Sequence, residues 1–143
     1  MAVVMNTSNS QRWIRTAILF GAVYAVIGIA LAAPTNSAPA DHVKIWRLTA
    51  WGVSALAFAA HLWYEHSRLR NSPVRTALHM SLAVALGAFG LAASANVHAW
   101  WVGPNHQRLL TFALVGWPVL TGVPAFVVAL VMAAGLGLIR RSS

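Results

Sequence analysis

The chain has 143 residues, of which 59% are hydrophobic and only 8% are charged. An ordinary soluble domain carries about 25% charged residues, so this chain could not cover a globular surface with solvated groups. The composition is that of a membrane protein, and the length indicates a single domain, residues 1–143. The absence of cysteine excludes disulfides, zinc–thiolate sites, iron–sulfur clusters and a thiol nucleophile.

The net charge of +8 raises the question of nucleic acid. A nucleic-acid-binding domain gathers its basic residues on one face or stripe. Here the arginines instead stand in short clusters that flank apolar runs, as the positive-inside rule predicts for cytoplasmic ends. These clusters are Arg12 and Arg15, then Arg68, Arg70 and Arg75, then Arg140 and Arg141. The partner that this pattern predicts is a lipid bilayer, and no nucleic acid is expected.

Four apolar segments are long enough to cross about 30 Å of hydrocarbon, which takes about 20 helical residues. In chain order they cover residues 14–33, 45–66, 74–101 and 109–139. The sequence therefore predicts an all-α fold, a four-transmembrane-helix bundle with antiparallel up-down topology.

The first segment has a rival interpretation as a cleaved signal peptide. Arg12 and Arg15 would form its basic region, and Ala30-Leu31-Ala32 resembles a small-residue cleavage site. However, the apolar stretch exceeds the roughly 7–15 residues of such signals. A retained span is the favoured interpretation.

The connection between the second and third segments is short and well specified. Ser72 is placed to cap the third helix, and Pro73 suits its first position, where the missing N–H has no helical partner. The two helices are thus expected to be antiparallel neighbours.

The fourth segment contains Pro118 and Pro124. Each proline removes the hydrogen bond to the carbonyl four residues earlier, at Leu114 and Leu120, and is expected to kink the helix. Such a break can present free carbonyls to an ion, although neighbouring helices more often accommodate the bend.

Orientation follows from the basic residues of the connections. The two ends and the middle connection hold seven Lys and Arg, whereas the other two connections hold three, namely Lys44, Arg47 and Arg108. With an even number of spans, both termini are expected to be cytoplasmic in the inner membrane.

Small residues recur at four-residue spacing, which lets helices approach closely in lipid. The pairs are Gly21 and Ala25, Gly28 and Ala32, Ala83 and Gly87, and Gly90 and Ser94. The pattern does not distinguish packing within one chain from packing between copies.

The segment from His61 to His79 carries the main candidate site. His61 and His79 are expected at nearly the same depth on adjacent helices, and Glu65 is one turn from His61. The trio is compatible with axial ligation of haem b by His61 and His79, with a metal bound by His61, Glu65 and His79, or with proton relay. The alternative is structural: neutral histidines between helices, and Glu65 paired with Arg68 at the surface.

A second group of histidines, His42, His98 and His106, lies at the opposite end and matches no metal-site spacing. The chain also contains no phosphate-binding glycine loop, no H-E-x-x-H and no G-x-S-x-G. The function predicted is therefore non-catalytic: an accessory subunit of a membrane complex or a self-associating bundle. The alternatives are a haem- or metal-binding subunit for electron transfer and a small channel or transporter.

Overall fold

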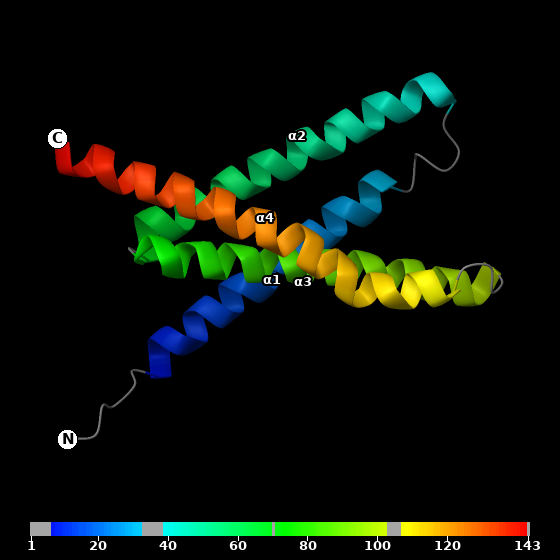
Figure 1. The fold of residues 1–143 in the computed structure, drawn as a ribbon, viewed down its shortest axis with the longest axis horizontal. Helices are drawn as coiled ribbons and strands as arrows, with labels where there is room; N and C mark the ends of the chain where they lie inside the picture. Colours follow the sequence, from blue (N-terminus) through cyan, green and yellow to red (C-terminus); the bar gives the residue numbers. More distant parts are fainter. Residues whose placement is uncertain (1–6, 33–38, 70, 103–106, 143) are drawn as a thin grey trace.

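The computed structural model describes residues 7–32, 39–69, 71–102 and 107–142. Four long helices account for nearly all of these residues (Figure 1). They are α1 (Thr7–Ala32), α2 (Ala40–Tyr64), α3 (Pro73–Val102) and α4 (Gln107–Ser142), and α2 continues into a π-helical turn, η2 (Glu65–Leu69). The prediction of an all-α fold with four helices is confirmed.

The helices alternate in direction along the long axis of the molecule. α1 and α3 run from one end to the other, and α2 and α4 return (Figure 1). α3 and α4 lie side by side along their length, and α1 crosses them. α2 meets the other helices through its carboxyl-terminal end and then diverges, so that residues 51–56 are all exposed.

Three of the described helices have the length and hydropathy to cross a membrane. The apolar stretches are Trp13–Ala32, Pro73–Trp101 and Arg108–Leu138, with mean hydropathies of 2.0, 1.6 and 2.3. α2 has 25 residues, but Lys44, Arg47 and its small and polar residues dilute its apolar character. Three of the four predicted segments are thus helices that are long and apolar enough to cross a membrane, and a span by α2 stays a prediction.

Glycine allows the close approach of α1 and α3. A methyl group on Gly87 would lie 2.5 Å from the Cβ of Tyr24, and one on Gly21 would lie 2.9 Å from the Cβ of Leu86. Neither position has room for a side chain. The small residues at 21 and 87 therefore serve packing within the chain, which the sequence pattern left open.

α3 and α4 are joined by polar contacts and by a small apolar core. The Ser81 hydroxyl donates to the Gly122 carbonyl at 2.9 Å, and the Asn96 amide donates to the Leu110 carbonyl at 2.7 Å. Such hydrogen bonds contribute about 0.6 kcal/mol on average between membrane helices. The core cluster beside them consists of Leu62, Ala77, Met80, Ala129 and Ala133.

α4 is continuous through both of its prolines. The Thr121 hydroxyl donates to the Trp117 carbonyl at 2.9 Å, which supplies a local polar contact between the two prolines. The helix is therefore not divided into two half-helices of the kind that coordinate ions in transporters.

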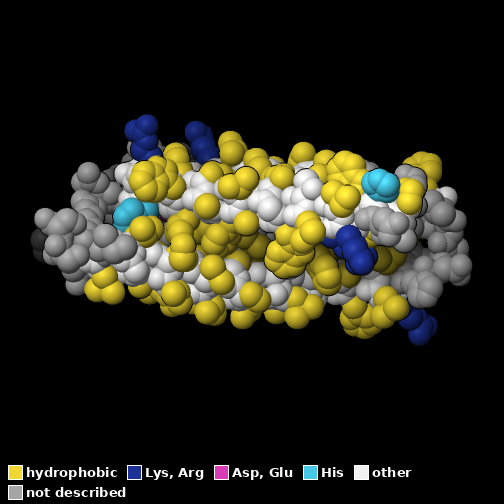
Figure 2. Space-filling model, turned by 90° about the horizontal axis from the view of Figure 1, so that it is seen from above, with side chains coloured by type: hydrophobic (Ala, Val, Ile, Leu, Met, Phe, Trp, Pro, Cys, Tyr) yellow, Lys and Arg dark blue, Asp and Glu magenta, His cyan; other side chains and the backbone are white. Residues whose placement is uncertain are grey.

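The side chains on the outside of the bundle are largely apolar. Figure 2 shows a face covered by hydrophobic side chains, with Lys and Arg toward its two ends and no acidic side chain in view. Large exposed residues include Ile18, Leu56, Phe112 and Val131. This distribution suits a hydrocarbon solvent, with the cations at the level of the headgroups.

Replacing Gly87 by alanine is expected to lower the free energy of unfolding by about 1–3 kcal/mol, the usual effect of overpacking. Gly116 is the matched control, because nothing lies within 4 Å of an added methyl group there. Alanine at position 116 should leave stability unchanged or raise it slightly. Unfolding of both variants in mixed micelles, followed by circular dichroism, measures the difference, and equal stabilities would contradict the proposed packing of α1 on α3.

Candidate functional site

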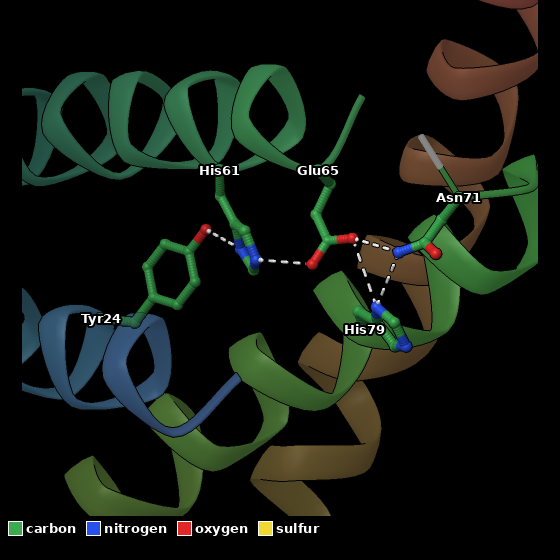
Figure 3. A network of polar contacts seen from close by, with 5 residues as sticks. All are labelled: Tyr24, His61, Glu65, Asn71 and His79. Carbon is green, nitrogen blue, oxygen red and sulfur yellow. Dashed lines mark hydrogen bonds and ion pairs between the residues drawn. The ribbon is translucent and has the colours of Figure 1, made fainter. Parts of the chain in front are cut away.

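His61, Glu65 and His79 come together at the carboxyl-terminal end of α2 (Figure 3). Glu65 lies between the two histidines. Its Oε1 is 3.9 Å from Nε2 of His61, and its Oε2 is 3.3 Å from Nδ1 of His79. The predicted convergence of these three side chains is therefore present in the structure.

The π-helical turn η2 begins at Glu65. Regular α-helix was expected to continue to about residue 66, so the wider turn is a difference from the prediction. The backbone N–H of Glu65 still reaches the carbonyls of His61 and Leu62, and the turn then widens over the five residues that follow α2. π-Turns are rare and recur at functional sites because they change the direction in which a side chain points.

The carboxylate of Glu65 accepts two polar contacts on the same oxygen. The Asn71 amide donates to Oε2 at 2.9 Å, and Nδ1 of His79 lies 3.3 Å from the same oxygen, where it donates in the tautomer that carries its proton on Nδ1. Asn71 stands in the connection between η2 and α3, so Glu65 ties the end of α2 to both the connection and α3.

Glu65 and His61 are completely buried, and the side chain of His79 is 14% exposed. The sequence left open a surface pair between Glu65 and Arg68. Instead, Arg68 is exposed and Glu65 is directed inward. A buried carboxylate loses the solvation that water would give it, so its protein contacts have to replace that solvation.

Two buried atoms of the site have no hydrogen-bond partner among the described residues. They are Nε2 of His61 and Oε1 of Glu65, the same two atoms that face each other at 3.9 Å. That distance exceeds the range of about 2.7–3.2 Å for an N–H···O hydrogen bond. The two atoms are therefore nearly, but not fully, in contact.

Aromatic side chains of α1 stack on the imidazole rings of His61 and His79. Phe20 stacks on His61 with ring centroids 3.8 Å apart, and Trp13 stacks on His79 at 4.9 Å. The Tyr24 hydroxyl lies 3.4 Å from Nδ1 of His61. The site is thus built from three helices.

The sequence reasoning missed the contribution of α1 and that of Asn71. The prediction did not place Trp13, Phe20 or Tyr24 at the site. A usable signal was present, since residues seven and four apart share one helical face. The buried Ala17 and Gly21 on the same side of α1 mark it as the packed face.

Haem ligation by His61 and His79 finds no support in this geometry. Axial ligands must direct nitrogens at one iron from opposite sides, whereas both imidazoles direct a nitrogen at the carboxylate of Glu65. An iron about 2 Å from Nε2 of His61 would fall in the space that Oε1 of Glu65 borders. Among the described residues, no group of three or more His, Asp or Glu side chains is arranged to hold a metal ion.

The remaining histidines lie apart from this site. His66 is half-buried on η2, and His42 and His98 are exposed on α2 and α3. His106, the third member of the predicted second group, lies outside the described residues. The second group is therefore not assembled by the residues that the structure describes.

A cavity of about 400 Å³, partly open to the outside, lies between α2 and the other three helices, and all four helices line it. Its wall is mainly apolar and includes Trp51, Phe58 and Trp117. Tyr24 belongs to this wall and also contacts His61. Tyr24 thus connects the cavity with the buried His61–Glu65–His79 cluster.

Comparison of the chain with protein-family models, with curated proteins and with solved structures found no match. The function therefore has to be argued from the geometry of the chain itself.

Replacing Glu65 by alanine is expected to lower the free energy of unfolding by about 1–3 kcal/mol, because Asn71 and His79 lose a buried acceptor. Glutamine at position 65 keeps a carbonyl for these donors and should be less destabilising. His66→Ala, on the same turn, should stay within about 0.5 kcal/mol of the parent. Unfolding titrations in mixed micelles give the three values, and a fully stable Glu65→Ala variant would contradict the role assigned to the carboxylate.

Proposed function

We propose that this protein is a multi-pass protein of the inner membrane that crosses the bilayer four times and acts by associating with other membrane-embedded polypeptides. It would be an accessory subunit of a membrane complex or a bundle that assembles with copies of itself, without catalysis of its own. The observation that supports this proposal best is the exposure of α2.

Four crossings are favoured by the directions of the helices. α1 and α3 run the same way along the molecule (Figure 1), so α1 ends and α3 begins at opposite ends. α2 is the helix that joins these ends. If α1 and α3 both cross the membrane, α2 has to return through it, although it falls below the hydropathy of the other three helices.

The orientation with both termini in the cytoplasm is supported by the distribution of charge. Seven of the ten basic residues belong to the two ends and the middle connection. Short connections rich in Lys and Arg are retained on the cytoplasmic side.

α2 supports a protein partner because it is both relatively polar and poorly covered. Residues 51–56 are all exposed, and the space beside Gly52 is open. Thr49 and Ser54 lie on this helix as well. A helix of limited hydropathy is more stable against protein than against lipid tails, since close packing and hydrogen bonds hold membrane helices together. The same argument favours association over a lone bundle.

The other candidate functions are less well supported. Haem ligation would need His61 and His79 to turn away from Glu65. For a metal ion, no group of three or more His, Asp or Glu side chains among the described residues is arranged as a binding site. A channel or transporter built on the prolines of α4 would need a broken helix, whereas α4 is continuous.

Single cysteines test the path of α2 directly, because the chain has none of its own. A membrane-impermeant maleimide should label Asn36→Cys in intact spheroplasts. Ser72→Cys and Ser143→Cys should react only after lysis, since both are expected on the cytoplasmic side. Labelling of positions 36 and 72 from the same side would show that α2 does not cross.

A photo-crosslinking amino acid at Leu56 tests the exposed face of α2. Leu56 is 71% exposed, and Val26 on α1, which is 64% exposed, is the matched control. We expect position 56 to give one discrete protein adduct, identified by mass spectrometry as a second copy or as a subunit that also co-purifies stoichiometrically. We expect position 26 to react with lipid. Adducts with lipid alone at position 56 would contradict the proposal.

A further inference from the structure

We propose that His79, Glu65, His61 and Tyr24 form a proton relay between the edge of the bundle, near the connection of η2 to α3, and the central cavity. This role goes beyond association with a partner. It is carried by the line of contacts in Figure 3 and by the two buried, unpartnered atoms at its centre.

The four groups lie in series, and each can donate or accept a proton, with one open link of 3.9 Å between Glu65 and His61. His79 is the accessible end, with 14% of its side chain exposed, and Nδ1 contacts Oε2 of Glu65 at 3.3 Å. Oε1 of Glu65 faces Nε2 of His61 at 3.9 Å, and Nδ1 of His61 lies 3.4 Å from the Tyr24 hydroxyl. Tyr24 ends the series in the wall of the cavity.

Each group can accept a proton on one atom and release one from another. Protonated His79 gives the proton on Nδ1 to Oε2 of Glu65, which becomes a neutral carboxylic acid. After the carboxyl group rotates, its O–H donates to Nε2 of His61. The imidazolium releases the proton on Nδ1 to the Tyr24 oxygen as the phenolic proton passes to a water molecule that enters the cavity. One proton enters, one leaves, and the net charge of the site is unchanged. His61 ends with its proton on Nε2 and has to return to the Nδ1–H tautomer before the next transfer.

The central gap requires only a small movement. Shortening 3.9 Å to a hydrogen-bond length needs a shift of about 1 Å, and Oε1 of Glu65 has no partner to hold it back. A purely structural network is expected to pair these two atoms, because an unpaired buried polar group is destabilising. The open distance between Glu65 and His61 is therefore the feature that distinguishes a proton relay from a purely structural network.

The surroundings leave few competing groups for the proton. Tyr24 faces His61 from α1, and His79 faces Glu65 from α3. Between Leu109 and Leu138, α4 contains no titratable side chain. The rings of Phe20 and Trp13 stack on the two imidazoles and exclude water from their faces. Ionisable groups at such depth are costly and commonly mark proton pathways.

The exchange of the ring protons of His61 with bulk water tests the relay. ¹⁵N-histidine-labelled protein in lipid nanodiscs would be compared by NMR with the Glu65→Gln, His79→Gln and His66→Gln variants. His61 should exchange rapidly in the parent although it is completely buried. The exchange rate should fall about 100-fold in the first two variants, the usual contribution of a positioned acid or base. His66→Gln should match the parent.

The His79→Gln variant is included because Glu65→Gln alters a fully buried side chain and could impair folding, whereas His79 is partly exposed. Circular dichroism and elution volume show whether each variant remains folded. Slow exchange in the parent would overturn the relay and leave a structural network. Unchanged or faster exchange in folded His79→Gln would overturn it as well, since His61 would then reach water by another path.

Discussion

The burial of the Glu65 carboxylate is the constraint on which the arrangement of α2 depends. This is one of only two acidic residues in the chain, and it is placed where water does not reach. Its contacts with Asn71 and His79 replace part of the lost solvation. Because those partners lie on the connection and on α3, the carboxylate holds the end of α2 against the bundle while the rest of the helix diverges.

The same constraint links the fold to the proposed functions. Only the carboxyl-terminal end of α2 packs closely on the bundle, and the side of the helix that does not line the cavity is the surface proposed to meet another membrane polypeptide. The contacts at this end of α2 include three side chains that can take up protons. His79 lies at the edge of the bundle, and Glu65 and His61 are buried. Association through the exposed part of α2 and proton transfer through Glu65 and His61 are thus compatible proposals. An experiment that contradicts one of them leaves the other standing.

Hydropathy and spacing predicted much of this structure. The long apolar runs predicted the four helices, and Pro73 predicted the start of α3. Counting residues from the connection between η2 and α3 predicted that His61 and His79 lie at the same depth.

The rest of the structure depended on three-dimensional packing. The π-turn at Glu65 and the inward direction of its carboxylate follow from contacts with Asn71 and α3, which spacing along one helix does not encode. The stacking of Phe20 and Trp13 required knowing which face of α1 packs on the site. The small residues at positions 21 and 87 were recognised, but only the crossing of α1 and α3 showed that they pack within the chain.

The coupling between Glu65 and His79 tests this account most directly. Unfolding free energies of Glu65→Ala, His79→Ala and the double variant, measured under the same micelle conditions, give the interaction energy of the pair. The account predicts a favourable coupling of about 1–2 kcal/mol, at the upper end for polar contacts between membrane helices. Additive effects, within about 0.5 kcal/mol, would show that the carboxylate does not hold α2 to α3.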